Sequence, residues 1–247
     1  GKDLYENFND VRELFDSANE ILGYDLLNIC FNGPEDSLKQ TENTQPAIYM
    51  MDVAIYNILK SNGLKPKMMA GLSLGEYGAL TAAGSINFQD GIDLVRKRAK
   101  FMQEAVPLGK GAMAAILGLP AEDVEKCCTI SADVGIVEPA NYNCPGQIVI
   151  SGERKAVAKA CEHAKDIGAK RAILLPVSAP FHCSLLQPAA AKLNSELESI
   201  RIKDPKTTVI SNVTAKPIDS SDQIVELLTR QVTHSVRWQE SIEYMIE

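Results

Sequence analysis

Ser73 stands at the centre of a five-residue pattern with glycine at both ends, Gly71-Leu72-Ser73-Leu74-Gly75. Small residues around a serine let the backbone turn sharply and present the hydroxyl, as in the nucleophile elbow of acyl-transferring enzymes. The apolar stretch 67–70 suits a buried strand before this turn, and the stretch 75–83 suits a helix after it. Such a helix would direct its first amides at the oxygen where negative charge develops. The pattern alone is equally compatible with a tight turn that has no catalytic role.

A serine hydroxyl is a weak nucleophile at neutral pH, so Ser73 would need a general base. The chain contains three histidines, His163, His182 and His234. His182 follows a predicted strand end and precedes a predicted helix, which is where sites gather in open α/β sheets. His163 lies in a polar helical stretch typical of a solvated side chain, and His234 is the second choice. A purely structural role for His182 stays open on these residues alone.

Arg98 gives an independent indication of a site. A helix predicted over residues 89–106 places apolar residues and Arg98 on one arc, made of Leu94, Ala105, Arg98, Met102, Val95 and Ala99. A guanidinium keeps its charge, so burial requires a carboxylate or an equivalent partner, which could belong to a substrate. The alternatives are a salt bridge to a buried Asp or Glu, or a side chain that extends to solvent.

The elements that must position these residues alternate between helices and strands. Apolar residues from Leu4 to Ala18 recur at helical spacing. A second helix is predicted to begin with Thr44 as its N-cap and Pro46 near its start, and to end before Gly63. Later elements are a helix over 184–199, a strand over 208–210 and a helix from about residue 221. This order predicts an α/β fold with a mainly parallel sheet flanked by helices, a hydrolase-like core.

The middle of the chain has a different order of predicted strands and helices. Its predicted order is strand 112–117, helix 121–130, strand 134–141, strand 147–151, helix 153–167 and strand 171–177. This β-α-β-β-α-β order is typical of a ferredoxin-like α+β subdomain. We therefore predict a large domain made of residues 1–108 and 179–247, with an inserted subdomain at 109–178.

Composition excludes several classes of protein. The chain has 247 residues, is 45% hydrophobic and carries a net charge of −7, so general nucleic-acid binding is not expected. No apolar run approaches the roughly 20 residues that span a bilayer, and no signal peptide is evident, so we expect no membrane insertion and a cytoplasmic location. The six cysteines form no C-x-x-C pair and no metal-ligand cluster with the histidines. We expect free thiols and no metal site.

Five motifs in order along the chain carry a resemblance to a known family. They are Gly71-Leu72-Ser73-Leu74-Gly75-Glu76-Tyr77, Arg98-Ala99-Lys100-Phe101-Met102-Gln103, Asn141-Tyr142-Asn143-Cys144-Pro145-Gly146-Gln147, Ser178-Ala179-Pro180-Phe181-His182 and Val236-Arg237-Trp238. With them the chain resembles, over nearly its whole length, the malonyl-CoA:acyl carrier protein transacylases of bacterial fatty-acid synthesis. The family's histidine before the nucleophile is here Leu72.

The resemblance implies a role for each matching position. Ser73 would be the acylated nucleophile, and His182 the general base and later acid. Arg98 would hold the malonyl carboxylate. The family orients its histidine with a backbone carbonyl, here that of Gln231. The Leu74 amide would be one hydrogen-bond donor of the oxyanion hole. Asn141 and Asn143 match family positions that lie near the pantetheine arm of the substrate.

The implied reaction is a ping-pong transfer. Malonyl-CoA would acylate Ser73, and the phosphopantetheine thiol of acyl carrier protein would then remove the malonyl group. The expected partners are therefore malonyl-CoA and acyl carrier protein. No metal or redox cofactor is expected, because the coenzyme A thioester is itself the substrate.

The resemblance is incomplete at both ends of the chain. The family begins with an apolar strand and a Gly-Gln-Gly loop that supplies a second oxyanion amide, whereas this sequence opens at Gly1-Lys2-Asp3. It also stops before the family's last Gly-Pro-Gly strand and helix. From the sequence we expect this chain to be impaired or unstable as written, since one oxyanion donor contributes about 10²- to 10³-fold in rate.

Three other functions remain open on the sequence. A serine esterase or patatin-like hydrolase shares the elbow, but a buried Arg98 argues against neutral acyl substrates. A malonyl-loading acyltransferase domain of a polyketide synthase would use the same chemistry, and Phe181 before His182 resembles the malonyl-selective pattern. A carrier-binding module without catalysis would form no covalent adduct on Ser73.

Overall fold

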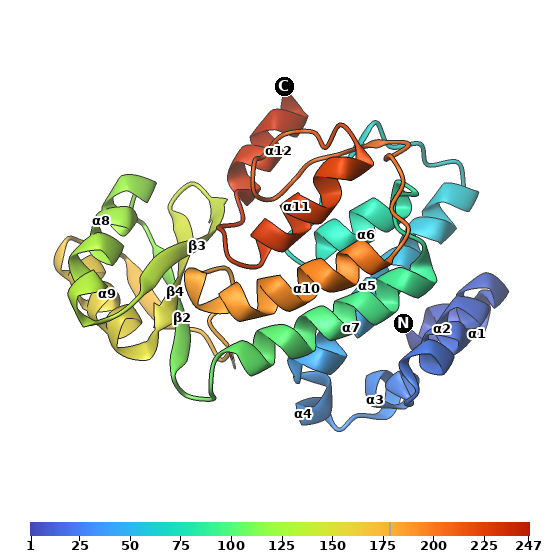
Figure 1. Ribbon diagram of the computed structural model, residues 1–247, viewed down its shortest axis with the longest axis horizontal. Helices are drawn as coiled ribbons and strands as arrows, with labels where there is room; N and C mark the ends of the chain where they lie inside the picture. Colours follow the sequence, from blue (N-terminus) through green and yellow to red (C-terminus); the bar gives the residue numbers. More distant parts are fainter. Residues whose placement is uncertain (178) are drawn as a thin grey trace. The chain divides into compact units, whose positions relative to one another are not determined.

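The computed structural model describes residues 1–177 and 179–247 (Figure 1). The chain forms two compact units. The first unit comprises Gly1–Lys100, Glu196–Ile210 and Pro217–Ile224. The second unit comprises Phe101–Ser195, Ser211–Lys216 and Val225–Glu247.

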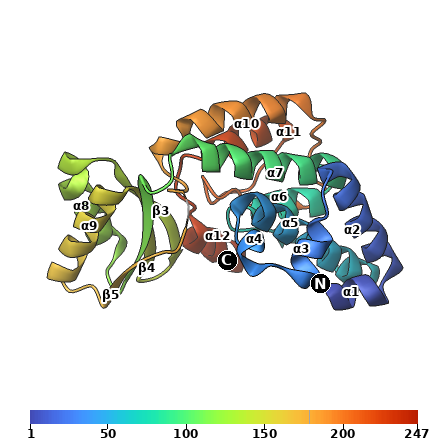
Figure 2. The same cartoon turned by 90° about the horizontal axis from the view of Figure 1, so that it is seen from below.

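The first unit is mainly helical around a short parallel sheet. Its elements are α1 (Lys2–Asn7), α2 (Asn9–Leu22), α3 (Leu26–Asn32), α4 (Glu35–Leu38), α5 (Thr41–Ser61), β1 (Met68–Met69), α6 (Gly75–Ala82), most of α7 (Phe88–Ala105) and β6 (Thr208–Val209). β1 pairs with β6 in parallel, with Met69 opposite Val209. α6 packs against both α5 and β6, and Figure 2 shows α5 and α6 next to each other. The strand, turn and helix expected around Ser73 are present here.

Two expectations for the N-terminal helices are wrong. The apolar repeat from Leu4 to Ala18 belongs to two helices, because the backbone at Phe8 is extended and separates α1 from α2. Thr44 does not cap α5: its amide and its hydroxyl both donate to the carbonyl of Gln40, one turn earlier. The helix therefore begins at Thr41, and Pro46 lies inside it.

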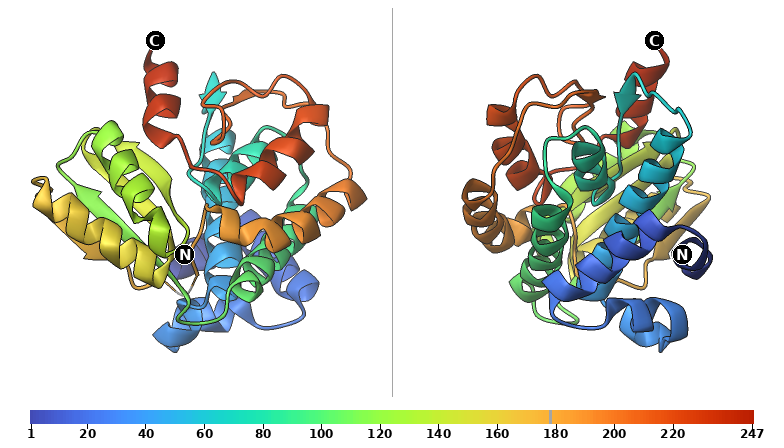
Figure 3. Two further views of the ribbon diagram at one scale, coloured as in Figure 1. Left: turned by 60° about the vertical axis from the view of Figure 1, so that its left-hand side comes forward. Right: turned by 90° about the vertical axis from the view of Figure 1, so that its right-hand side faces the viewer.

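The second unit contains the ferredoxin-like segment. Its elements are β2 (Gly111–Leu117), α8 (Ala121–Ser131), η1 (Ala132–Val134), β3 (Val137–Cys144), β4 (Gln147–Glu153), α9 (Arg154–Asp166) and β5 (Arg171–Leu174). The sheet order is β3-β4-β2-β5 and all neighbours are antiparallel, which is the predicted β-α-β-β-α-β topology. α8 and α9 cover one face, side by side in Figures 2 and 3, and share an apolar core with the strands.

Later segments of the chain complete the second unit. They are η2 (Ser184–Leu186), the first part of α10 (Gln187–Ser199), most of α11 (Ser221–Gln231) and α12 (Trp238–Ile246). The backbone of Val236 donates a hydrogen bond to Ala140 and accepts one from Tyr142, and so pairs in parallel with the edge strand β3. The compact unit that holds the expected insert at 109–178 thus also includes residues 101–108, 179–195, 211–216 and 225–247. Within the described ranges, no helix is both long and apolar enough to cross a membrane.

Candidate active site

Ser73 lies in a strained turn between β1 and α6. Its φ of 53° is in the left-handed region, which residues with a side chain rarely adopt. Gly71 makes the turn possible: a Cβ at this position would lie 2.0 Å from the carbonyl atoms of Gly75. The backbone of Gly75 can approach only because residue 71 has no side chain. The sequence pattern therefore folds as a sharp elbow with the serine at its apex.

The amides that follow Ser73 are used within the turn. Gly75, Glu76 and Tyr77 donate their N–H groups to carbonyls three residues earlier, at 2.9, 3.2 and 3.0 Å. Leu74 precedes them as the buried N-cap residue of α6. Among the first amides of this helix, the one at Leu74 is thus the candidate donor to an oxyanion at Ser73.

Arg98 extends from α7 to the serine within the first unit. Its side chain is only 1% exposed, as the projection of the helix predicted. One terminal nitrogen donates to Oε1 of Gln45 at 2.6 Å, and the other donates to Oγ of Ser73 at 3.1 Å. The guanidinium carbon lies 5.3 Å from the centre of the Tyr77 ring, which is cation–π distance. A fixed positive charge is therefore held directly beside the hydroxyl.

Burial has an electrostatic cost for this cation. Desolvation lowers the pKa of Arg98, and the charge of Glu76, whose side chain is fully buried in the first turn of α6, acts in the opposite direction. A guanidinium nevertheless keeps its proton in proteins. The arrangement can bind an anion at Ser73, because a second carboxylate would add hydrogen bonds and charge neutralisation to a desolvated fork.

His182 and Gln231 are in contact within the second unit. The His182 ring is 4% exposed, and its Nδ1 lies 2.7 Å from the backbone oxygen of Gln231. Gln231 is the last residue of α11, where helix carbonyls have no partner within the helix. Because a carbonyl only accepts, Nδ1 must carry the proton, which leaves the lone pair on Nε2. The φ of His182 is 59°, a second left-handed residue outside glycine.

The remaining predicted positions lie in the second unit or outside the described residues. Asn141 is a buried residue of β3 opposite Val236, and Asn143 is half-buried two residues farther along the strand. His234 is exposed, with Nδ1 2.9 Å from the carbonyl of Arg230. Ser178 of the motif that ends at His182 lies outside the described residues. No group of three or more metal-ligating side chains occurs in 1–177 and 179–247.

Sequence reasoning missed three residues around Arg98. Gln45 had no signal, because an amide inside a helix is an ordinary surface residue until its partner is known. Glu76 and Tyr77 were part of the recognised motif, but their contact with α7 depends on the packing of two helices. Both side chains are fully buried.

Known proteins match this chain over nearly all of its length. The model of the acyl transferase domain family matches residues 1–247. A curated relative from Escherichia coli K12, named malonyl CoA-acyl carrier protein transacylase, is 47% identical over 98% of this chain and 79% of its own. A crystal structure of the protein of that name from Clostridium perfringens is 51% identical, with a TM-score of 0.96 over all of this chain and 78% of its own.

A further solved relative was captured with a partner. It is described as a malonyl-transacylase in complex with the acyl carrier protein of a type II polyketide synthase, and it is 45% identical with a TM-score of 0.96 over 99% of this chain and 80% of its own. The sequence identity and the shared fold point to the same family as the elbow at Ser73 and the buried Arg98 beside it. This chain belongs to the acyl transferase domain family.

Proposed function

We propose that this chain transfers a malonyl group from malonyl-CoA to the phosphopantetheine thiol of an acyl carrier protein through a malonyl ester on Ser73. The observation that carries the proposal is the 3.1 Å contact between the buried guanidinium of Arg98 and Oγ of Ser73. In a malonyl thioester one methylene separates the carboxylate from the reacting carbonyl. A cation beside the nucleophile therefore suits this acyl group and not a neutral one.

The relatives support the same substrates. The protein from Escherichia coli is named for malonyl-CoA and acyl carrier protein, and the solved complex contains a carrier protein. The carrier protein in that complex belongs to a polyketide synthase. We therefore propose an acyl carrier protein as the acceptor without specifying a fatty-acid or a polyketide carrier. Fatty-acid and polyketide carriers share the phosphopantetheine thiol that the reaction requires.

We assign to each residue one part of the reaction. Ser73 attacks the thioester carbonyl, and His182 takes the serine proton on Nε2. The carbonyl of Gln231 accepts a hydrogen bond from Nδ1–H of His182 and so keeps Nε2 available as the base. The Leu74 amide stabilises the oxyanion of the tetrahedral intermediate. The C–S bond then breaks, and the coenzyme A thiolate leaves with the proton from His182. The carrier thiol reverses these steps and regenerates Ser73.

The carbonyl of Gln231 replaces the carboxylate of a conventional triad in this assignment. A neutral carbonyl fixes the tautomer of His182 but stabilises an imidazolium less than a carboxylate does. Asn141 and Asn143 would contact the pantetheine arm. The exchange of thioester for ester and back balances without a metal or redox cofactor. We place the reaction in the cytoplasm, consistent with six cysteines that are all free thiols.

The proposal is tested by trapping the ester. The chain is incubated with malonyl-CoA without acceptor, and intact mass with peptide mapping should show one malonyl group on Ser73. Ser73→Ala should show none, whereas Ser61→Ala, an exposed serine of the same unit, should be labelled as the parent is. Excess acetyl-CoA should compete poorly. Absence of an adduct in the parent, or labelling of Ser73→Ala, would remove the assignment.

A second measurement separates transfer from hydrolysis. The malonyl-enzyme is mixed with holo carrier protein or with buffer alone, and the products are followed by mass. Malonyl-carrier should form much faster than free malonate. Release as malonate at the same rate with and without carrier would favour the hydrolase.

A further inference from the structure

His182 occupies a strained position in a loop of the second unit. Its φ of 59° lies in the left-handed region, which is disfavoured for a residue with a side chain. The short helix η2 begins two residues later, at Ser184. A residue other than glycine keeps such a backbone conformation only where its surroundings fix it. The contacts that fix this loop are therefore the contacts that place the His182 ring.

A carboxylate on β3 binds the loop directly after His182. Oε2 of Glu138 accepts the backbone N–H of Ser184 at 2.8 Å, and Oε1 accepts the Ser184 hydroxyl at 2.7 Å. Ser184 is the first residue of η2, where amides have no partner within the helix. Hydrogen bonds to an ionised acceptor are stronger than bonds between neutral groups. Both oxygens of Glu138 thus hold one residue, two positions after the histidine.

Packing holds the loop on the other side of His182. The Phe181 ring packs against apolar residues of β2, β3 and β4. Pro180 lies directly over β2, because a Cβ on Gly111 would come 2.4 Å from the proline ring. The residues before His182 are therefore fixed by apolar contacts with the sheet, and the residues after it are fixed by Glu138.

The carbonyl that orients His182 is held by the same strand. The chain that follows Gln231 reaches β3 at Ser235, whose hydroxyl donates to the carbonyl of Pro139. The next residue donates its amide to the carbonyl of Ala140 at 2.8 Å. β3 therefore binds the segment that carries the carbonyl as well as the loop that carries the imidazole, and all of these residues belong to the second unit.

We propose that Glu138 is a positioning residue that holds His182 in the geometry of a general base. The inference rests on the proposed role of His182 in acyl transfer. Three consecutive residues of β3, 138–140, bind the histidine loop and the segment after Gln231. They thereby set the 2.7 Å distance from Nδ1 of His182 to the Gln231 oxygen. Glu138 acts through Ser184, and it is the side chain of this assembly that a substitution can remove from the strand.

Loss of the Glu138 carboxylate has a specific consequence for proton transfer. A displaced loop weakens the bond from His182 to Gln231, which selects the tautomer with its proton on Nδ1. The other tautomer carries its proton on Nε2 and cannot take the proton of Ser73 there. The rate of the chemical step should therefore fall. Binding of malonyl-CoA should change little, because the carboxylate is assigned to Arg98 on another element.

The first test observes the His182 tautomer by ¹⁵N NMR of the histidine side chains at about pH 8, where an ordinary histidine is neutral. The parent should show the Nδ1–H form, with the signal assigned by its loss in His182→Gln. Glu138→Ala should add a population with the proton on Nε2. Glu138→Gln should keep the parent spectrum, because its amide oxygen still accepts from the Ser184 N–H and its NH₂ can donate to the hydroxyl.

An unchanged tautomer in a folded Glu138→Ala variant would overturn the proposal and leave Glu138 as a stabilising cap of η2. The spectrum requires no substrate, so it is independent of whether the chain transfers malonyl groups. A parent that forms no ester on Ser73 would refute the proposed function, and the position of the ring would still be decided by NMR.

The second test measures malonyl-enzyme formation in a single turnover. Glu138→Ala should lower the maximal rate about 10- to 100-fold and change the half-saturating concentration of malonyl-CoA less than about threefold. Glu138→Gln should stay within about threefold of the parent rate. Ser184→Ala loses one of the two bonds and should have an intermediate rate, which provides a variant if Glu138→Ala does not fold. A glutamine variant as slow as the alanine variant would overturn hydrogen bonding as the means.

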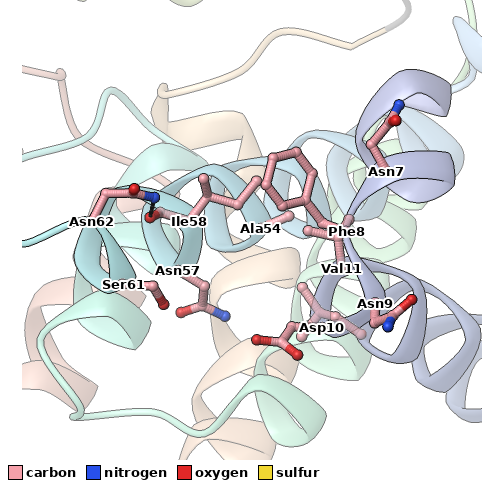
Figure 4. A pocket seen from close by; sticks show the side chains of 11 residues that line it. Asn7, Phe8, Asn9, Asp10, Val11, Ala54, Asn57, Ile58, Ser61 and Asn62 are labelled. Atoms are coloured by element: carbon pink, nitrogen blue, oxygen red, sulfur yellow. Dashed lines mark hydrogen bonds between the residues drawn. The ribbon is translucent and has the colours of Figure 1, made fainter.

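Two control variants remove similar bonds elsewhere. Glu153 of β4 accepts the amide of Ile136 at 3.2 Å, so Glu153→Ala also deletes a carboxylate–amide contact of the second unit. Figure 4 shows Asn62 at a cavity of the first unit, where its side-chain amide donates to the carbonyl of Ile58 at 2.8 Å. Glu153→Ala and Asn62→Ala should lower stability but keep the His182 tautomer and the parent rate. A tautomer change in either control equal to that in Glu138→Ala would trace the effect to lost stability and overturn the assignment.

Discussion

At the scale of single residues, the proposed role of Arg98 is to distinguish malonyl from acetyl substrates by one buried charge. Arg98 is desolvated and already contacts Gln45 and Ser73. In the proposed reaction a malonyl carboxylate adds a charge-assisted hydrogen-bonded pair to the guanidinium, whereas an acetyl group adds none. On this assignment the arginine favours the malonyl group over the neutral acetyl group.

Arg98→Ala should remove this discrimination. Loss of one partner of a buried pair costs about 3 to 5 kcal/mol, so kcat/KM for malonyl-CoA should fall by about 10²- to 10⁴-fold. Acetyl transfer should fall far less, because the acetyl group makes no ion pair. Rates of acyl-enzyme formation with both thioesters measure the ratio. An equal loss on both substrates would show that Arg98 supports the turn and not the substrate.

Gln45→Glu tests whether the guanidinium must stay available to the substrate. The substitution is nearly isosteric, but it places a carboxylate 2.6 Å from Arg98 and neutralises its charge internally. We expect KM for malonyl-CoA to rise at least about tenfold with little effect on acetyl transfer. Gln45→Met, which removes the hydrogen bond without adding charge, is the matched control and should raise KM less. A lower KM in Gln45→Glu would contradict this account.

At the scale of elements, the elbow depends on the two glycines to different extents. A Cβ on Gly71 would lie 2.0 Å from backbone atoms of Gly75, whereas a Cβ on Gly75 meets nothing within 4 Å. Gly71→Ala should therefore destabilise the first unit by at least about 3 kcal/mol or prevent the turn. Gly75→Ala should leave stability equal or raise it by up to about 1 kcal/mol, because it replaces glycine at the start of a helix.

Urea unfolding of the parent and both variants measures this difference. Comparable destabilisation in the two alanine variants would mean that the close approach at Gly71 does not shape the elbow. Activity is a poor readout here, because both glycines lie two residues from Ser73, and a change beside the nucleophile can alter the rate without altering stability.

Local signals were sufficient for elements whose residues interact with near neighbours. The glycines of the elbow, the periodicity of α7 and the strand–helix alternation of the second unit all predicted the observed elements. The same reasoning failed at Phe8, where an extended residue interrupts a continuous apolar repeat, and at α5, which begins three residues before the predicted cap. Threonine forms caps and back-bonds to helix carbonyls with the same hydroxyl, and the sequence does not distinguish them.

The site was predictable to the extent that single residues carry the chemistry. Ser73 and Arg98 were selected from the pattern and from the helix projection, and the structure places them in contact. The resemblance supplied Gln231, whose carbonyl lies beside His182. Gln45 was not predictable, because its contact with Arg98 joins residues 53 positions apart on two helices.

At the scale of the whole molecule, each unit encloses groups that favour the protonated state. In the second unit, desolvation raises the pKa of Cys183 to about 11 and that of Cys128 to about 12, both from 9.0. In the first unit, burial raises the pKa of Tyr77 from 10.0 to about 12. These groups hold their protons more tightly in the folded chain than in the unfolded one.

Stability should therefore fall at alkaline pH in a way that depends on the two thiols. A raised folded-state pKa gives a contribution that is complete below pH 9.0 and is lost as the pH rises toward 11 for Cys183 and 12 for Cys128. Each thiol adds a slope of up to about −1.4 kcal/mol per pH unit to the free energy of unfolding in that window.

Urea unfolding under reducing conditions, at several pH values from about 8 to 10.5, measures this slope. Cys128→Ala with Cys183→Ala should unfold more easily at every pH but with a flatter dependence, whereas Cys144→Ala, which removes an exposed thiol of the same unit, should keep the slope of the parent. If the double variant retains the parent slope, other groups cause the alkaline loss and the buried thiols do not.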